Sequence, residues 1–447
     1  MHLPLKTLCL AVIICTFVTT QHVQSTESVS TLELGIEEFV EIALLNNPGV
    51  DEARNEVWAA EGRNTQATSA YLPQLSASGR ASRVHINDLT PVEEDNVFSG
   101  TLTGDQLLYD FGKTTGSISA ATSQIEAAKA YLNTVGSDLV HAVKSSYYTV
   151  LAKNYLIKVA KDQVNSYQKH YERASEYYKA GVKSKIDVTN AEVELENSKL
   201  QLLQSKFSLK SAKVNLEKII GIAPNNGSYI VKLTDNKLSD FRDLLDDFPD
   251  SLEELLQKAS LQRPDLIRAK KEIESSESLL KGAHGGYWPE IGLNGSYNNY
   301  ETDINTLQDQ WQFGIGLDWQ FFSGFRTNGE VAEAKSNLRT SRARLRNIKL
   351  NAIQEVTDSY HLAQEKRDSV LLADKIMQLA AENLTLADER YKTGLGDMIE
   401  FNDSQLRMTK ARSNLVNTYF DYNIALASLE NAIGYFPVMS PPESKQL

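Results

Sequence analysis

The side chains that usually carry enzyme chemistry are present in this sequence, but they are not spaced for it. Both cysteines, Cys9 and Cys15, lie within the first fifteen residues, so the rest of the chain has no thiolate nucleophile, disulfide or cysteine metal ligand. The seven histidines show no ligand spacing, and no HExxH motif occurs. The glycine-rich stretch 281–286 follows a predicted helix and precedes a predicted strand, the wrong order for a phosphate-binding loop. We therefore expect no enzyme activity, no cofactor and no metal site.

Composition further restricts the possible partners and the type of fold. The 447 residues include 46 Lys and Arg against 58 Asp and Glu, a net charge of −12 that argues against nucleic acid as a partner. Only 11 prolines occur, and none lies between Pro91 and Pro224 or between Pro289 and Pro437. Two stretches of more than a hundred residues therefore lack the strongest helix breaker.

The first residues have the order of a secretory signal. Lys6 precedes an apolar run at 8–18, which a polar stretch follows. Eleven residues are too few to span a bilayer as a helix. We predict a signal peptide over 1–25. Lipidation of Cys15 is not expected, because Ile14 stands where a small residue normally precedes a lipidated cysteine. No later run reaches 18 apolar residues, so the mature chain is either soluble outside the cytoplasm or crosses a membrane by strands.

The chain contains one unit twice. Pro48 and Pro264 are 216 residues apart and share their surroundings, whereas Gly181 and Gly394, like the closing Gly-x-x-Pro motifs, are 213 apart. The three residues of slack fall between 75 and 113, where a loop varies most easily. We predict a first repeat at 32–224, a connecting equatorial segment at 225–250, a second repeat at 251–437 and a C-terminal tail at 438–447.

Within each repeat the hydrophobic period changes in the same order. Each repeat is expected to begin with a helix and continue into a β-hairpin. Heptad patterns then predict a long helix and a return helix, at 113–179 and 184–220 in the first repeat and at 326–392 and 397–433 in the second. Each of the two long helices, 113–179 and 326–392, would span about 100 Å at 1.5 Å per residue.

Alternation with a period of two precedes each long helix and predicts the hairpins, at 73–109 and 289–322. The strongest example places six large apolar residues on one face of a strand, with small or polar residues between them, a pattern typical of a lipid-facing strand around a wet lumen. These residues are Trp311, Phe313, Ile315, Leu317, Trp319 and Phe321. A half-buried hairpin on a soluble domain is the alternative for this pattern.

Geometry then requires assembly. Four strands cannot close a barrel, and an open sheet edge is not tolerated in hydrocarbon. Three copies give twelve strands and a bore, which accounts for the glycines and glutamines on the other face. The predicted fold class is mixed: long coiled-coil helices form an α-helical tunnel, and four β-strands per protomer contribute to a trimeric twelve-stranded membrane β-barrel.

These features together resemble the TolC-like outer membrane efflux proteins, over residues 32–437. The resemblance rests on the signal sequence, the duplicated unit with YLPQL, the Leu-Tyr-Asp-Phe-Gly before the first long helix, the Tyr-x-x-Gly motifs and the closing Gly-x-x-Pro. It implies a homotrimeric channel-tunnel in the outer membrane of a Gram-negative bacterium, in contact with outer membrane lipid and with a periplasmic helical domain. It also implies a periplasmic adaptor (membrane fusion) protein and an inner-membrane pump as partners. Such a tunnel exports small molecules or proteins as the outer component of a tripartite efflux or type I secretion system.

The same resemblance implies roles for particular residues. The helix-turn-helix tips, Gly181-Val182 and Gly394-Leu395, match the turns that the adaptor grips. Glu400 and Asp403 match acidic positions of the periplasmic constriction. Asp187 and Tyr391 match a hydrogen-bonded pair that ties two helical hairpins together when the tunnel is closed. A basic residue that relatives carry two places after the turn glycine is Gly396 here, opposite Ile186 in the other repeat, so a second latch of the gate is missing or differently built.

A second function class remains open from the sequence. A secreted trimeric coiled-coil protein with a structural or adhesive role and no membrane barrel would show the same heptads. The sequence does not identify the exported substrate or the type of pump.

Overall fold

The computed structural model describes residues 33–86, 93–224, 229–232, 237–245, 248, 251–301 and 308–435. The predicted signal peptide and the C-terminal tail lie outside these residues. Within them, no helix combines the length and apolar character needed to cross a membrane.

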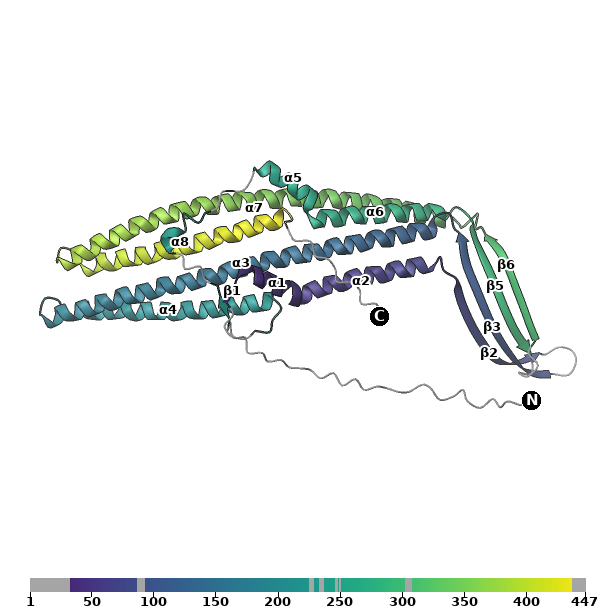
Figure 1. The fold of residues 1–447 in the computed structure, drawn as a ribbon, viewed down its shortest axis with the longest axis horizontal. Coiled ribbons are helices and arrows are strands. Elements are labelled where there is room, and N and C mark those ends of the chain that lie inside the picture. The colour runs from purple at the N-terminus through teal and green to yellow at the C-terminus, as the bar shows by residue number, and fades with distance from the viewer. Residues whose placement is uncertain are drawn as a thin grey trace.

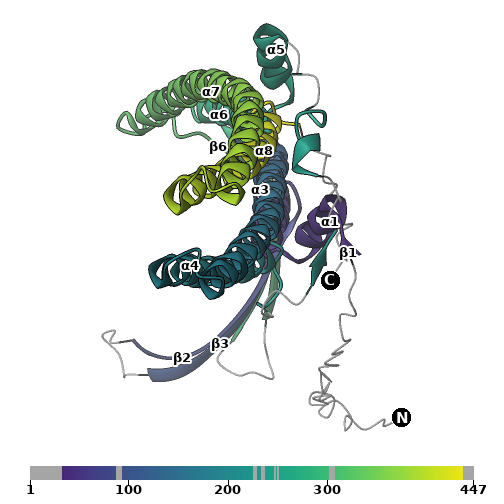
Figure 2. The ribbon, with the colours of Figure 1, turned by 90° about the vertical axis from the view of Figure 1, so that its left-hand side faces the viewer.

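Two very long helices dominate the molecule (Figure 1). These are α3, Lys113–Lys179, and α7, Arg326–Lys392, each of 67 residues. Each is followed by a return helix that packs against it, α4 (Lys185–Ile219) after α3 and α8 (Met398–Ala432) after α7. Helix α3 also packs against α8, so the four helices form one curved wall (Figure 2).

Each repeat begins with two helices, and this corrects the single helix expected from the sequence. In the first repeat they are α1, Ile36–Asn46, and α2, Pro48–Ser69; in the second they are α5, Leu252–Gln262, and α6, Pro264–Gly285. A proline opens the second helix of each pair, because it lacks the N–H that the preceding turn would need and its φ suits a first helical position.

The break between these helices docks on the end of the return helix. The Asn47 side-chain amide donates to the Ile219 carbonyl, and the Arg263 guanidinium donates to the Ala432 carbonyl, both at 2.8 Å. The glycines of the Gly-x-x-Pro motifs make this approach possible. Gly221 has φ +79°, and a Cβ there would lie 2.4 Å from the Asn46 carbonyl oxygen; Gly434 has φ +76°, and its Cβ would lie 2.8 Å from the Arg263 Cα.

The four strands form one antiparallel sheet in the order β2-β3-β5-β6. Their bounds are β2 Gln74–Ile86, β3 Glu93–Tyr109, β5 Glu290–Glu301 and β6 Gln308–Asp318. The register gives the sheet two unlike faces. One face carries Leu75, Leu102, Leu293, Tyr297, Trp311, Phe313, Ile315 and Leu317; the other carries Ser76, Thr101, Thr103, Asn294, Ser296, Gln310 and Gln312.

Strand β6 is shorter than the alternation predicts. It ends at Asp318, so Trp319 and Phe321 lie beyond the strand, although both side chains are exposed. The indole N–H of Trp319 donates to the Tyr287 carbonyl at 3.2 Å. This is a correction to the predicted lipid-facing strand, which retains Trp311, Phe313, Ile315 and Leu317.

A sharp turn joins the sheet to each long helix. Before α3 the buried Asp110 carboxylate accepts from the backbone N–H groups of Gly112 and Thr114, which caps the helix. The turn uses two consecutive left-handed residues, Phe111 and Gly112; the turn before α7 uses Gly324 and Phe325. The Asp-Phe-Gly part of the sequence motif therefore serves to redirect the chain.

A belt of smaller elements covers the convex side of the wall near its middle (Figure 2). Strand β1 (Glu33–Leu34) pairs in parallel with β4 (Ile230–Val231), and α1 packs against α3. After the 3-10 turn η1 (Leu238–Asp240), Phe241 is buried and stacks on Tyr419 with ring centroids 4.1 Å apart. These contacts anchor the segment between the two repeats.

Candidate functional site

Two exposed turns form the end of the molecule farthest from the sheet (Figure 1). At these tips Gly181 has φ +76° and Gly394 has φ +75°, and each N–H closes the last turn of its long helix. The apolar residues that follow are open to solvent, Val182 with 69% and Leu395 with 75% of the residue exposed. Ile186 and Ile399 are also exposed, so each tip presents an apolar surface that is open to solvent.

The predicted hydrogen bond between Asp187 and Tyr391 is absent. The Asp187 carboxylate instead accepts from the backbone N–H and the hydroxyl of Ser184, at 3.0 and 2.8 Å, and so caps α4. The Tyr391 hydroxyl is buried and has no hydrogen-bond partner in the part of the chain that the structure describes. Burial, and next the negative charge of Asp187, raise the pKa of Tyr391. The two groups are therefore electrostatic neighbours, but they form no latch in this structure.

An aromatic stack joins α3, α7 and α8 beside that tyrosine. The imidazole of His170 lies 4.3 Å from the Phe401 ring and 4.9 Å from the Tyr391 ring, measured between centroids. His170 is 2% exposed, and neither ring nitrogen has a hydrogen-bond partner among the described residues. Burial lowers the pKa of His170 to about 4; the positive charge of Arg173 acts in the same direction, and the Asp388 carboxylate opposes it.

The two acidic residues at the start of α8 have different surroundings. Glu400 pairs with Arg390 of α7, with Nε and Oε1 3.0 Å apart. Asp403 is exposed, and among the described residues its one ion-pair partner is the distant Arg407, at 3.8 Å. A Cβ at Gly396 would lie 3.0 Å from a Glu400 carboxylate oxygen and 3.1 Å from the Arg390 Cβ. The glycine therefore leaves room for the ion pair.

Arg390 is the residue that the sequence reasoning missed. A basic group was sought two positions after the turn glycine, at Gly396, but the structure supplies one from the last turn of α7. Its guanidinium also lies 3.3 Å from the Leu395 carbonyl, so Arg390 organises the second tip as well. No spacing signal in the sequence marks this arginine, because the pairing depends on the path of the turn.

A second ion-pair group ties the first long helix to the other. Arg173 of α3 pairs with Asp388 of α7 at 2.8 Å, and Lys392 pairs with the same carboxylate at 2.6 Å. Burial raises the pKa of Asp388, but the bonds from Lys392 and Arg173 outweigh it and leave the pKa below its ordinary value. The carboxylate is therefore ionised and shared by two cations, which stabilises the contact between the two hairpins.

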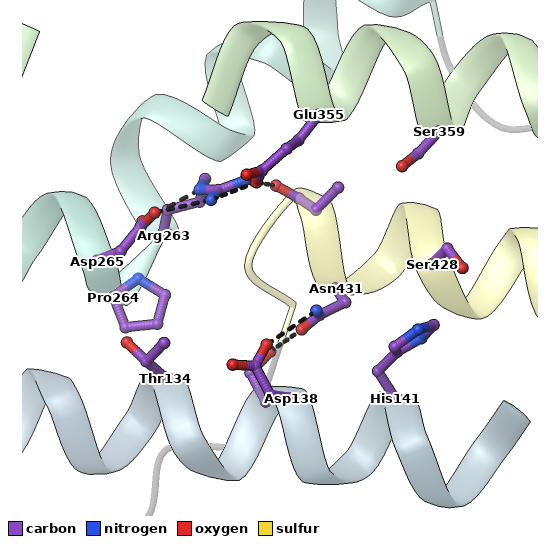
Figure 3. Close-up of a pocket in the computed structure, with 12 residues that line it drawn as sticks. Thr134, Asp138, His141, Arg263, Pro264, Asp265, Glu355, Ser359, Ser428 and Asn431 are labelled. Carbon is purple, nitrogen blue, oxygen red and sulfur yellow. Dashed lines mark hydrogen bonds and ion pairs between the residues drawn. The ribbon is translucent and has the colours of Figure 1, made fainter. Parts of the chain in front are cut away.

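A polar pocket of about 360 Å³ lies between α3, α6, α7 and α8 at the middle of the wall (Figure 3). Arg263 spans it and pairs with Asp265 and Glu355, both at 2.7 Å. On the opposite side the Asn431 amide donates to Asp138 at 3.1 Å. These contacts join the repeats. Among the described residues no group of three or more His, Cys, Asp or Glu side chains is arranged to hold a metal ion.

Comparison with known protein families identifies the architecture. Residues 39–222 and 255–435 match the family model described as outer membrane efflux protein. The chain is similar to nodulation protein T of Rhizobium leguminosarum bv. trifolii, with 23% identity over 411 residues that cover 90% of this chain and 86% of that protein. It is also similar to the cation efflux system protein CusC of Escherichia coli, with 21% identity over 409 residues and coverage of 89% and 86%.

Solved structures share the fold. A crystal structure of CusC has a TM-score of 0.80 at 20% identity and covers 90% of this chain and 93% of that one. The outer membrane channel CmeC of Campylobacter jejuni has a TM-score of 0.78 at 19% identity, with 89% and 85% covered. The mixed fold class expected from the sequence, long helices with a four-stranded sheet, is therefore confirmed.

Proposed function

The chain belongs to the outer membrane efflux protein family, and from that premise we propose that three copies form the outer membrane channel of an export machine. The four-stranded sheets close a twelve-stranded barrel, and the curved helical walls close a tunnel below it. A tunnel conducts its cargo and performs no chemistry on it. Related proteins are named for the efflux of cations, toluene and antibiotics.

The observation that supports this proposal is that the two long helices, although equivalent, do not have equivalent neighbours within one chain. Helix α3 packs against both α6 and α8 of the second repeat, whereas the equivalent helix α7 has no comparable packing against α2 or α4 in the part of the chain that the structure describes. Because the repeats are equivalent, α2 and α4 of another copy fit this vacant side of α7.

Apolar side chains on α4 support this assembly. Leu203 and Phe207 lie 213 residues before Val416 and Phe420 of α8. Val416 and Phe420 are buried, the latter beside Tyr155 of α3. Phe207 is 60% exposed, against 4% for Phe420. A second copy of α7 would cover Phe207 in the way that α3 covers Phe420.

Glycines repeat this pattern near the sheet. A Cβ at Gly116 of α3 would lie 2.8 Å from the Ser278 carbonyl of α6, so the two helices touch closely. The equivalent positions are Gly329 of α7 and Gly62 of α2, and neither has any atom within 4 Å of its Cβ position. Two glycines facing open space fit a close helix crossing between copies.

Charges are also complementary at the predicted contact between α7 of one copy and α2 of another. The Arg268 guanidinium of α6 lies over the Tyr131 ring of α3, 4.8 Å from its centroid. The residues equivalent to Tyr131 and Arg268 are Arg344 and Glu52, respectively. The cation–π contact within the chain thus becomes an ion pair between copies.

The sheet edges give an assembly register. Strands β2 and β6 each lack a second partner strand in the part of the chain that the structure describes. Leu102 of β3 pairs with Tyr297 of β5, and the equivalent residues are Ile315 of β6 and Ala81 of β2. In this register the apolar faces of the two copies coincide, which is what a lipid-facing barrel wall needs.

The far end of the tunnel supplies the partner contacts and the gate. We assign the exposed apolar tips at Val182 and Leu395 to a periplasmic adaptor, which joins the tunnel to an inner-membrane pump. Glu400 and Asp403 are assigned to the constriction, where threefold symmetry makes each a ring of three carboxylates. Arg390 paired with Glu400 takes the place of the missing basic latch.

Cysteine cross-linking tests the proposed assembly. The chain has no cysteine after Cys15, so the pair Ile315→Cys with Ala81→Cys introduces two thiols on facing edges. Directly opposed residues of an antiparallel pair have Cα atoms about 4.5–5.5 Å apart, which suits a disulfide. Oxidation of the protein in outer membranes is expected to give disulfide-linked trimers on non-reducing gels.

The control shifts one partner by a single residue. Ile315→Cys with Ser82→Cys places the thiols on opposite faces of the sheet and is expected to leave the chain monomeric on the same gel. Cross-linking of neither pair, with the protein recovered in the soluble fraction after osmotic shock, would favour a secreted coiled-coil protein instead.

A further inference from the structure

The outer part of α7 carries a concentration of positive charge that the rest of the chain does not share. Residues 334–354 contain six Lys and Arg and no acidic residue, although the whole chain has a net charge of −12. The equivalent residues of α3, 121–141, contain one lysine and two acidic residues. The duplicated architecture therefore does not require this charge.

Five of the six cations lie on one face of the helix. Spacings of four, three, four and three residues separate them, which places them along a single stripe. We define the basic stripe as Lys335, Arg339, Arg342, Arg346 and Lys349. At 1.5 Å per residue it is about 21 Å long.

The basic stripe is exposed and mostly unpaired. Arg342 pairs with Glu277 of α6 at 2.8 Å. The other four side chains are exposed and form no ion pair or hydrogen bond with any residue that the structure describes. They are therefore available to an external anion.

The stripe faces the outside of the wall. Seven residues beyond Lys349, the same face carries Val356, which is buried together with Leu255 of α5. One turn further, Tyr360 packs against Phe248, with ring centroids 5.1 Å apart. Helix α5 lies on the convex side of the wall (Figure 2), so the stripe lies on that side too, between α5 and the sheet.

Neighbouring copies would not cover the sheet-proximal part of the stripe. The residues of α3 equivalent to Lys335 and Arg339 are Thr122 and Glu126. Both remain exposed although α2 and α6 pack on either side of α3. In the proposed assembly α7 would be packed in the same way, by α6 of its own chain and α2 of a second copy. Lys335 and Arg339 would therefore stay exposed, as Thr122 and Glu126 do.

The position of the stripe selects among anionic partners. Counted along α7 from Arg326, it begins about 14 Å and ends about 35 Å from the sheet. Charges are screened beyond roughly 8 Å at physiological ionic strength, so lipid headgroups at the barrel rim are too distant for most of it. An extended polymer with regularly spaced carboxylates, at that depth outside the tunnel, fits both the length and the charge.

We propose that the basic stripe of α7 binds the carboxylate-bearing peptide stems of the peptidoglycan layer and thereby holds the tunnel in the cell wall. The inference rests on the proposed function for the orientation of the chain in the envelope. Its chemistry is that of cations meeting carboxylates across an exposed surface, so the binding weakens with salt.

Co-sedimentation with purified peptidoglycan sacculi tests the proposal, using the full chain in detergent. The wild-type protein is expected to sediment with sacculi at low salt and to be released at high salt. Lys335→Gln with Arg339→Gln is expected to weaken binding by about tenfold, since each cation near an anionic surface contributes appreciably. The charge-preserving pair Lys335→Arg with Arg339→Lys is expected to bind like wild type.

A matched control removes the same charge elsewhere. Lys161→Gln with Lys169→Gln alters two exposed lysines of α3 and is expected to leave binding unchanged. The proposal is overturned if the Lys335 and Arg339 glutamine variant binds like wild type, or if this control loses as much. It is also overturned if phosphatidylglycerol vesicles, and not sacculi, bind through the stripe. The Ile315 and Ala81 cross-link, measured on the same preparations, reports separately on the proposed assembly.

Discussion

At the scale of single residues, His170 is a group whose positive charge the fold disfavours. Its ring contacts two aromatic rings and has no hydrogen-bond partner among the described residues, while Arg173 on α3 adds positive charge and Asp388 on α7 partly offsets it. The unfolded chain takes up this proton near pH 6.5, whereas the folded protein takes it up near pH 4. Between these values the unfolded state binds more protons, so stability falls as the pH is lowered.

We predict that contacts of the His170 stack lose about 3 kcal/mol between pH 7 and pH 4, from a pKa difference of about two and a half units. Amide hydrogen exchange of the helix around His170, followed from pH 7 to pH 4.5 and corrected for intrinsic exchange rates, measures the loss. His170→Phe keeps a ring in the stack and removes the proton site, so its protection is expected to vary less with pH. An unchanged pH dependence in His170→Phe would assign the effect to other groups.

Some residues of the candidate site could be predicted from the sequence, and others could not. The tip glycines were recognisable because a left-handed turn between two heptad helices favours glycine. The Asp187–Tyr391 bond expected for a closed tunnel is not formed in this structure, where Ser184, three residues before Asp187, donates to its carboxylate in a local capping box. Arg390 and His170 acquire their partners only through tertiary packing, and no sequence spacing encodes that packing.

At the scale of elements, the docking of the helix breaks depends on Gly221 and Gly434. We predict that Gly434→Ala destabilises the fold by about 2–4 kcal/mol, because it combines a left-handed backbone with a Cβ in contact with Arg263. Gly181→Ala has the same φ but open space around it, so it is expected to cost only about 1–2 kcal/mol. Urea unfolding followed by far-UV circular dichroism compares the two variants. Equal losses would mean that the close approach to Arg263 contributes nothing.

The elements themselves were largely predictable, with two instructive exceptions. Heptads sustained over more than sixty residues leave no other structure for α3 and α7. The alternation of β6 continues to Phe321 in the sequence, but the pairing ends at Asp318, opposite Glu290. The next residue on the partner strand is Pro289, which has no N–H to donate. The breaks between the paired helices were not predicted. Pro48 and Pro264 were used to align the two repeats, and the hydrophobic period alone does not show that a short helix ends before each proline.

At the scale of the whole molecule, the internal duplication determines how the helices of the two repeats pack into one curved wall. The packing of α3 against α6 and α8 of the second repeat has no comparable counterpart in the packing of α7 within the described part of its own chain. In the proposed assembly a single chain therefore carries both halves of the interface between copies, at Phe207 and Gly62 on one side and along α7 on the other. The charge pattern of α7 departs from that symmetry, which is why the basic stripe points to a partner other than another copy.

The proposed symmetry also gives the constriction a testable ion preference. Each Glu400 carboxylate is partly neutralised by Arg390 at 3.0 Å, whereas Asp403 has its nearest cation, Arg407, at 3.8 Å. We predict opposite effects in planar bilayers: Asp403→Asn lowers the preference for K⁺ over Cl⁻, and Arg390→Gln raises it. A unit charge near a wet pore contributes on the order of 0.5–1 kcal/mol, which corresponds to about a twofold to fivefold change in the permeability ratio. Reversal potentials in a KCl gradient measure that ratio. Changes of the same sign in both variants would place these side chains away from the conduction path, because only a lumen-facing ring responds to removal of a positive and a negative charge in opposite directions.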